Sequence, residues 1–334
     1  MAGRNKITIE KIAMEAGVSI ATVSRLLSGK DSVKKETRQK ILDTMKALDY
    51  SPDTSNGITK PEGKLILMSF PELSNPVFSP IIDGAQTSAN RHGYHLLIHQ
   101  SRTIYKSITD YETLVTNNSV SGMILLSNIA EAEKLESFNL RCPIVMCSEF
   151  CEGCDISYVS IDDHAAAKNA TDYLLAMGRK KIVLMNSSLN NKYARHRESG
   201  YVASLQGAGI EVNEEWIVHL SDINFDLAMS SAIHILNSDN RPDAFFAVSD
   251  IYAAAIIKAC KRLGLSVPQD VSVVGFDNTD ITLMTDPAIT TVSQPGFQLG
   301  YQACDLLVER INNRNLPGKR ILLGTELIVR GSTL

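Results

Sequence analysis

The stretch ITIEKIAMEAGVSIATVSRLLSG, residues 7–29, decides the fold of the N-terminal part of this chain. Thr8 can cap a helix over Ile9–Ala16, because a hydroxyl that precedes a helix can accept a hydrogen bond from a free backbone N–H of its first turn. Ser19 can cap a second helix over Ile20–Leu27 in the same way. The stretch therefore predicts two short helices joined by a tight turn.

The turn between these helices, AGVS, contains Gly17, which adopts a left-handed backbone conformation without steric cost. Ala13 and Val23 stand where the two helices must approach each other closely. A glycine turn between two such helices is typical of a helix-turn-helix.

The second helix carries side chains that suit DNA. Ala21, Thr22 and Arg25 fall away from its apolar stripe and can face a groove. Arginine pairs bidentately with guanine, whereas the hydroxyls of Thr22 and Ser24 suit phosphate contacts. The motif predicts a DNA-reading domain, and the alternative is a structural helical hairpin with a surface arginine.

Charge is distributed unevenly along the chain. Residues 1–64 contain 12 Lys/Arg and 8 Asp/Glu, a net charge of +4, whereas the other 270 residues carry a net charge of −8. A basic N-terminal segment before an acidic remainder suits an N-terminal DNA-binding domain, because neutralisation of DNA phosphates supplies much of the affinity for DNA.

Composition excludes several classes of protein. With 334 residues, 44% of them hydrophobic and 21% charged, the chain is typical of a globular protein of two or three domains. No apolar run approaches the roughly 18–20 residues of a membrane span, and the N-terminus has no secretory signal. We therefore expect a cytoplasmic protein without a membrane partner. No nucleophile, P-loop or zinc-protease motif occurs, so we expect neither an enzyme nor a cofactor.

Beyond a third predicted helix at Lys34–Leu48, residues 51–63 have the composition of a linker, and a different pattern begins after Lys64. Apolar strands there alternate with amphipathic helices such as Ser79–His92, which predicts parallel sheets covered by helices on both faces. The strand candidates, more than one sheet comfortably holds, are Leu65–Phe70, His95–His99, Gly122–Leu126, Ile144–Cys147, Ser157–Ile161, Ile182–Asn186, Ala244–Val248 and Ser272–Gly275.

The chain resembles the lac/gal repressor family nearly from end to end. The matching segments are, in order, TIEKIAMEAGVSIATVSRLL, VKKETRQKIL, LDYSP, SNPVFSPIIDGAQ, RHGYHLLI, VSGMILL, SIDDHAAAKNATDYLLAMGRKKI, RPDAFFAVSDIYAAAIIKACKRLGLSVPQDVSVVGFDN, PAITTVSQP and ELIVRGST. The resemblance implies a small all-α helix-turn-helix domain followed by an α/β core of two lobes with parallel sheets, similar to periplasmic sugar-binding proteins.

The resemblance also implies the domain bounds. The helix-turn-helix domain should span residues 1–50, the hinge linker 51–63 and the core 64–334. Within the core, lobe one should comprise about 64–159 and 294–321, and lobe two about 160–292 and 322–334. The crossovers between lobes are expected near Ser160, Thr291–Gln294 and Leu322.

By the same resemblance, the partner is double-stranded operator DNA. Ile20, Ala21 and Arg25 occupy the base-reading positions, and Arg25 should provide most of the hydrogen-bonded readout. The backbone-contacting hydroxyls are those of Thr22, Ser24, Ser32 and Thr37, and we add Thr8 and Ser19 at the helix starts.

The hinge departs from the family pattern. Family hinges usually read YxPNxxARxL and form an alanine-rich helix on DNA, with a leucine that enters the minor groove. Here the segment reads YSPDTSNGITKP, with the poor helix former Gly57, and Ile58 or Thr59 stands in place of the leucine. Either the hinge helix still forms, or the linker stays flexible and a neighbouring DNA-bound activator becomes a further partner.

Family members bind a small effector between the lobes. The matching positions predict an aromatic wall from lobe one, polar side chains from lobe two, two residues near the crossovers, two on one loop and one that faces this loop. They are, in that order, Phe78; Arg197, Asp250 and Asp277; and Gln294, Asp162, Asn191, Tyr193 and Ile223. A carboxylate can accept from two adjacent hydroxyls while an arginine donates to the same sugar. The alternatives are a helix cap for Asp277 and a surface ion pair for Arg197.

The segments CSEFCEGCDISYVSIDD and TTVSQPGFQLGYQACDLLVERI look most like the cytidine-responsive branch of the family. The predicted effector is therefore a nucleoside such as cytidine, whose base could stack on Phe78. A sugar- or purine-responsive repressor is the alternative within the family. A solute-binding protein or a sugar-modifying enzyme is the alternative from another class.

Two further predictions concern assembly and cysteine chemistry. We expect a homodimer, because one recognition helix covers half of a typical site, and Ile81, Ile82 and Ala85 on helix Ser79–His92 form a candidate interface. Cys142, Cys147, Cys151 and Cys154 lie close together in sequence, which raises zinc binding or a redox switch as alternatives. Cys142 and Cys147 flank or end an apolar strand, so these two should point elsewhere.

Overall fold

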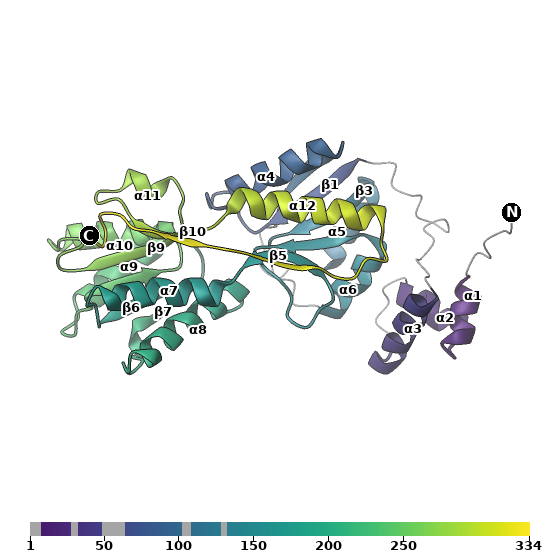
Figure 1. Ribbon diagram of the computed structural model, residues 1–334, viewed down its shortest axis with the longest axis horizontal. Helices are drawn as coiled ribbons and strands as arrows, with labels where there is room; N and C mark the ends of the chain where they lie inside the picture. The colour runs from purple at the N-terminus through teal and green to yellow at the C-terminus, as the bar shows by residue number, and fades with distance from the viewer. Residues whose placement is uncertain (1–7, 28–32, 49–63, 102–107, 128–131) are drawn as a thin grey trace. The chain divides into compact units, whose positions relative to one another are not determined.

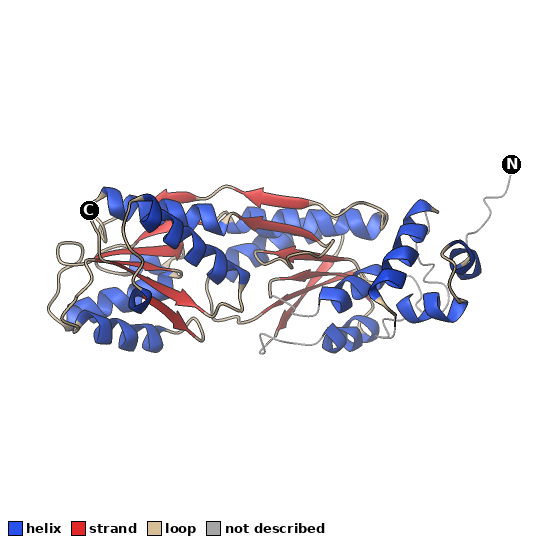
Figure 2. Cartoon of the chain, turned by 90° about the horizontal axis from the view of Figure 1, so that it is seen from below, coloured by secondary structure: helices blue, strands red, loops and turns tan. Residues whose placement is uncertain are grey.

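The computed structural model describes residues 8–27, 33–48, 64–101, 108–127 and 132–334 (Figures 1 and 2). By contacts, the chain divides into two compact units. The first unit comprises Met1–Pro71, Ala85–Tyr158 and Gln302–Arg320, and the second comprises Glu72–Gly84, Val159–Tyr301 and Ile321–Leu334. Residues 72–84 and 294–301, which the sequence assigned to lobe one, thus group with the second unit. These segments pack on each other, as the close approach of Gly296 to Pro80 shows.

Three helices form the N-terminal domain: α1 (Ile9–Glu15), α2 (Ile20–Leu27) and α3 (Lys35–Ala47). Their bounds agree with the predicted helices to within one residue. Gly17 has a φ of 62°, as the predicted turn requires. The small core between the helices contains Ile12, Ala13, Ala16, Val23, Leu26, Ile41 and Met45.

The two predicted helix caps differ in outcome. Oγ of Ser19 accepts a hydrogen bond from the backbone N–H of Thr22 at 3.1 Å, which confirms the cap of α2. Thr8 has the extended backbone of a cap, but its side chain makes no capping hydrogen bond. Instead, a hydrogen bond from the Thr8 side chain lowers the pKa of Glu10. The predicted capping role of the Thr8 hydroxyl was therefore wrong.

The first sheet has the strand order β11-β5-β4-β3-β1-β2. Its strands are β1 (Leu65–Phe70), β2 (His95–Gln100), β3 (Val120–Leu125), β4 (Ile144–Cys147), β5 (Ser157–Ile161) and β11 (Arg320–Leu323). The strands β2, β1, β3 and β4 are parallel neighbours. Almost every residue of β1, β3 and β4 is buried, as expected for strands covered on both faces.

Four helices flank this sheet: α4 (Phe78–Arg91), α5 (Ile108–Asn117), α6 (Ala132–Arg141) and α12 (Gly296–Asn312). Helices α4 and α12 cross closely, since a Cβ on Gly84 would lie 2.0 Å from the carbonyl oxygen of Phe297. Ile81 and Ala85 of α4 are only 1% and 0% exposed. The prediction that Ile81 and Ala85 form a dimer interface was therefore wrong, because these side chains belong to the protein's own core, whereas Ile82 of the same stripe is half-buried.

The second sheet has the order β12-β10-β9-β8-β6-β7. Its strands are β6 (Ile182–Ser187), β7 (Ile217–Leu220), β8 (Ala244–Ala247), β9 (Ser272–Asp277), β10 (Thr290–Ser293) and β12 (Glu326–Ile328). The neighbouring pairs from β7 to β10 are parallel, whereas β12 is antiparallel to β10.

The helices of this sheet are α7 (Asp163–Ala176), α8 (Lys192–Gly207), α9 (Phe225–Leu236) and α10 (Asp250–Arg262), with the short α11 (Ile281–Met284) after β9. Helix α7 packs on α8 and α9 on α10, so the pairs cover opposite faces (Figure 1). Strand order reverses at β6, which lies between β7 and β8. In open α/β sheets, ligands bind beyond the carboxyl ends of the strands at such a point.

The predicted fold class is confirmed: a helix-turn-helix domain precedes an α/β core with two parallel sheets. The described residues contain twelve strands, four more than the sequence suggested. The missed strands β7, β10, β11 and β12 have only three or four residues each. Among the described residues, none of the helices is both long and apolar enough to cross a membrane.

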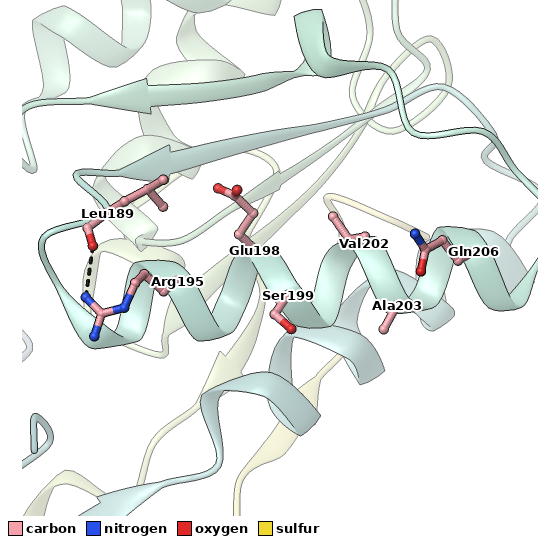
Figure 3. A pocket seen from close by; sticks show the side chains of 7 residues that line it. All are labelled: Leu189, Arg195, Glu198, Ser199, Val202, Ala203 and Gln206. Carbon is pink, nitrogen blue, oxygen red and sulfur yellow. Dashed lines mark hydrogen bonds between the residues drawn. The ribbon is translucent and has the colours of Figure 1, made fainter. Parts of the chain in front are cut away.

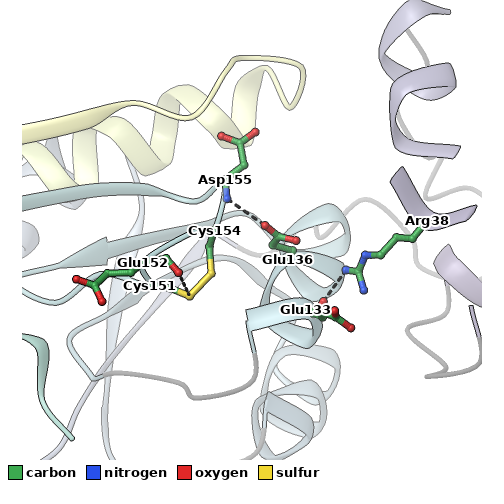
Figure 4. The surroundings of a disulfide bond; sticks show 7 residues. All are labelled: Arg38, Glu133, Glu136, Cys151, Glu152, Cys154 and Asp155. Carbon is green, nitrogen blue, oxygen red and sulfur yellow. Dashed lines mark hydrogen bonds between the residues drawn. A yellow bond between two sulfur atoms is a disulfide. The ribbon is translucent and has the colours of Figure 1, made fainter. Parts of the chain in front are cut away.

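The cysteines do not form one cluster. Cys151 and Cys154 are joined by a disulfide in the loop between β4 and β5 (Figure 4). Cys142 and Cys147 are buried and take no part in this disulfide, and burial raises the pKa of the Cys142 thiol to about 12. Within the described ranges, no group of three or more His, Cys, Asp or Glu side chains is arranged to hold a metal ion.

Candidate functional site

The topology brings most of the predicted effector residues to one edge of the second sheet. Asn191, Tyr193 and Arg197 follow β6, Asp250 follows β8, Asp277 ends β9 and Gln294 follows β10. Because these four strands are parallel, their carboxyl ends meet at the same edge.

Arg197 is the most tightly held of these side chains. Its Nε donates to Oδ1 of Asp163 at 2.8 Å, and Nη1 donates to the carbonyl oxygen of Val248 at 2.7 Å. The guanidinium carbon lies 3.4 Å from the ring centroid of Phe276 and 4.9 Å from that of Tyr193. Arg197 is 5% exposed, so it does not form the surface ion pair that was the alternative.

Sequence reasoning missed two residues behind Arg197. Nζ of Lys192 donates to Oδ2 of Asp163 at 2.6 Å and to Oγ of Ser160 at 3.1 Å. Burial by itself raises the pKa of Asp163, but the charges of Arg197 and Lys192 outweigh this effect and lower it. The second aspartate of SIDDH was the only available signal, because nothing in the sequence marks Lys192 as buried.

Asp277 is held in an unusual conformation at the end of β9. Its φ is 110°, a region that L residues rarely adopt and that is often found at functional sites. Its Oδ1 accepts a hydrogen bond from Nε2 of Gln294 at 2.6 Å. The nearest following helix, α11, has Asp280 at its N-cap position, so Asp277 is not the helix cap that was the alternative.

The carboxyl group of Asp277 changes its protonation state close to neutral pH. Burial raises the pKa of Asp277 to about 8, and the negative charges of Asp250 and Asp163 act in the same direction. The positive charge of Arg197 and the hydrogen bond from Gln294 oppose this rise without cancelling it. The carboxyl group can therefore either donate or accept hydrogen bonds at ordinary pH.

Asp250 is tied into the protein itself. Its Oδ2 accepts hydrogen bonds from the backbone N–H of Thr279 at 2.7 Å and from the Thr279 hydroxyl at 3.0 Å. Its Oδ1 accepts one from the hydroxyl of Thr291 at 2.6 Å. Burial raises the pKa of Asp250 to about 6. The carboxyl group thus links α10 to β10 and to the loop after β9.

The other predicted effector residues lie around this cluster or apart from it. Oδ1 of the exposed Asp162 accepts a hydrogen bond from the backbone N–H of Ala165 at 2.9 Å and caps α7. Nδ2 of Asn191 lies 3.4 Å from the hydroxyl of Tyr193. Phe78 is the first residue of α4, Ile223 lies in the loop between β7 and α9, and both are half-buried.

The DNA-facing candidates lie mainly on α2. Ile20 is 51% exposed, and Ala21, Ser24 and Arg25 are also exposed, whereas Val23 and Leu26 are buried. The hydroxyls of Thr22 and Ser19 are 2.7 Å apart, and Thr37 is half-buried on α3. Ser32 and the hinge at 51–63 lie outside the described residues.

A hollow of about 350 Å³ runs along α8, away from the cluster (Figure 3). Leu189 and one side of α8 line it, and Glu198 within it binds Asn186 and His219. Since none of the predicted effector residues contributes to this hollow, we assign it no ligand.

Comparisons with known proteins agree with this architecture. Residues 8–53 match the model of bacterial regulatory proteins of the lacI family, and residues 171–333 match that of a periplasmic binding protein-like domain. The HTH-type transcriptional repressor CytR of Escherichia coli strain K12 is 33% identical over 98% of this chain and 96% of its own length.

Two solved structures are also similar. The complex of the transcriptional regulator CelR with cellobiose is 27% identical, with a TM-score of 0.73 over 98% of this chain and 100% of that one. A protein from Actinobacillus succinogenes is 33% identical, with a TM-score of 0.76 over 82% of this chain and 100% of that one.

Proposed function

The chain belongs to the lacI family of bacterial regulatory proteins, and we propose that a nucleoside such as cytidine is the effector that controls it. Family membership makes the chain a DNA-binding transcriptional repressor with an effector-binding core. Its relatives are transcriptional regulators rather than enzymes.

The observation that carries the effector proposal is that one sheet edge holds both a fixed guanidinium and a fixed carboxyl group. Arg197 is positioned by Asp163 and Val248, and Asp277 by Gln294. An ionised Asp277 can accept from both hydroxyls of a ribose while Arg197 donates to the sugar oxygens. The carboxylate oxygens of Asp250 accept hydrogen bonds from Thr279 and Thr291, so Asp250 would stabilise this edge of the sheet and would not contact the ligand.

The remaining predicted effector residues complete this proposal. The base would stack on Phe78, and Tyr193, Asn191, Asp162 and Ile223 would surround the ligand. A sugar effector is the second candidate, favoured by the similarity to the CelR–cellobiose complex.

Calorimetric titration of the full chain with cytidine, adenosine, cytosine, ribose and cellobiose tests these proposals. Tightest binding of cytidine, with weaker binding of cytosine and ribose, supports a nucleoside effector. Tightest binding of cellobiose or ribose would replace it with a sugar effector.

For operator recognition, we propose that Ile20 and Ala21 read bases by shape and that Arg25 reads a guanine. The hydroxyls of Thr8, Ser19, Thr22, Ser24, Ser32 and Thr37 would contact phosphates. The exposure of Ile20, Ala21, Ser24 and Arg25 on one side of α2 supports this arrangement.

We further propose that the repressor is a homodimer assembled through the edge of the first sheet. Strand β2 ends the strand order of that sheet, and its Leu97 and Ile98 are 37% and 36% exposed. Exposed edge strands with apolar side chains tend to pair with another chain. Sedimentation of a Leu97→Asp/Ile98→Asp variant should show monomer where the unmodified protein shows dimer. A variant at the exposed loop residue Leu73, Leu73→Asp, is the control.

For the hinge, we propose a flexible tether at residues 51–63 and a neighbouring DNA-bound activator that helps to hold the repressor on DNA. The sequence departure at Gly57 motivates this proposal. Binding to operators with varied half-site separations should then depend only weakly on the separation. One sharp optimum would show that the hinge folds on DNA.

A further inference from the structure

Lys192 and Asp163 form a buried ion pair directly behind Arg197. Their side chains are 0% and 1% exposed, and Nζ of Lys192 lies 2.6 Å from Oδ2 of Asp163. A lysine buried to this degree is rare, because burial of an ammonium group is costly unless a partner compensates. Neither residue is among those that the sequence assigned to the effector.

The carboxylate of Asp163 is shared between two cations. Oδ1 accepts from Nε of Arg197, and Oδ2 accepts from Lys192, which also donates to Ser160. Asp163 starts α7, while Lys192 and Arg197 lie on α8, so the pair also joins two packed helices. The arrangement fixes Arg197 relative to both helices before any ligand arrives.

The contacts of Arg197 leave one part of the guanidinium for a ligand. Nε is taken by Asp163, Nη1 donates to Val248, and Phe276 lies under the plane. Among the contacts of the described residues, none engages Nη2 of Arg197 as a hydrogen-bond donor. This nitrogen is therefore the donor that a ligand at the sheet edge would meet.

We propose that Asp163 and Lys192 are positioning residues for Arg197, a role that rests on the proposed effector site. Asp163 holds the guanidinium in its binding orientation. Lys192 compensates part of the charge of Asp163, so that Arg197 keeps its positive charge for the effector. Orientation established during folding lowers the entropy that is lost on binding.

A double-mutant cycle with cytidine as the probe tests this role. The pair variant Asp163→Asn/Lys192→Met removes the charges of both partners together and keeps both side-chain volumes, so that Arg197 loses its carboxylate partner while Lys192 is not left as a second unpaired charge. The pair variant and Arg197→Gln are combined, and cytidine affinity is measured for all four proteins. The matched control is Lys168→Met/Asp172→Asn, which removes an exposed Lys–Asp pair of 2.6 Å from the same helix, α7.

If the pair acts through Arg197, the pair variant weakens cytidine binding by about tenfold in the unmodified protein and less than about twofold in the Arg197→Gln background. The Nε–H signal of Arg197, identified by its loss in Arg197→Gln, should also shift in the pair variant. The control pair should leave both the affinity and the signal unchanged.

Two results would overturn the assignment. Equal weakening in both backgrounds would show that the pair affects the ligand independently of Arg197. An unchanged affinity in a folded pair variant would show that Arg197 needs no positioning. Absence of cytidine binding by the unmodified protein would reject the proposed effector alone, and an unshifted Arg197 Nε–H signal in the pair variant would then reject the positioning role by itself.

Discussion

The amide nitrogen of Gln294 donates a hydrogen bond to Oδ1 of Asp277 over 2.6 Å. This bond joins the end of β9 to the residue after β10 and holds the carboxyl group of Asp277 in place. The backbone φ of Asp277 is 110°. Such a conformation costs about 1–3 kcal/mol and persists only where the surroundings fix it. The carboxyl group of Asp277 is therefore held in a fixed position at the carboxyl edge of the sheet.

Asp277→Ala should remove most of the affinity for cytidine and leave operator binding without effector intact. Each charge-assisted hydrogen bond lost should cost about 1.5–3 kcal/mol of binding free energy. Calorimetry with cytidine, 2′-deoxycytidine and 3′-deoxycytidine provides the measurement. The variant should no longer distinguish the three ligands, and a variant that still did would place the ribose elsewhere.

Cytidine affinity should rise with pH. Burial raises the pKa of Asp277 to about 8, so below that pH the empty site carries a protonated carboxyl group. Because ribose hydroxyls donate to the ionised form, binding releases a proton and is weaker at pH 6.5 than at pH 9. Asp277→Asn should flatten the profile, and an unmodified protein with a flat profile would contradict this prediction.

The raised pKa also gives a sign for stability. The folded state binds the proton of Asp277 more tightly than the unfolded state, in which the pKa of an aspartate is about 3.9. The contribution of Asp277 to the free energy of unfolding is therefore fully present below this unfolded pKa and is lost as the pH rises through about 8.

Arg25→Ala should abolish the preference for operator over random DNA. Loss of a bidentate guanine contact costs about 1–3 kcal/mol per half-site, whereas loss of a phosphate contact weakens binding to all sequences. Fluorescence anisotropy with operator and scrambled duplexes separates the two cases. Equal loss on both duplexes would mean that Arg25 contacts phosphate.

Gly200→Ala should destabilise the protein by about 1–3 kcal/mol through overpacking of α7 against α8. A Cβ at Gly200 would lie 2.2 Å from the carbonyl oxygen of His164. Gly207 lies on the same helix and has no atom within 4 Å of an added Cβ, so Gly207→Ala is the matched control. Urea unfolding of both variants provides the measurement. Equal free energies of unfolding for Gly200→Ala and Gly207→Ala would contradict the close approach of α7 and α8 at Gly200.

Continuous apolar runs made much of the fold predictable. The bounds of β1 and β4 were predicted correctly, because both strands are almost entirely apolar and buried. The bounds of β5 were also predicted correctly, although its sequence SYVSI includes two serines. Strands β11 and β12 escaped prediction, since they have only four and three residues, all of them exposed or half-buried.

Side-chain partners were harder to predict. The stripe of Ile81 and Ala85 was read as an interface, although a helix that covers a sheet needs the same apolar pattern for its own core. Lys192 was missed because lysine is almost always exposed, and only the fold brings Asp163 within reach to compensate its charge.

The measurement that tests the account most directly is operator affinity with and without saturating cytidine. The unmodified protein and Asp277→Ala are titrated onto an operator duplex selected by the protein itself. Coupling between effector and operator should change the affinity of the unmodified protein by about fivefold or more and leave that of Asp277→Ala unchanged. Equal affinity of the unmodified protein with and without cytidine would contradict the claim that a nucleoside controls this repressor.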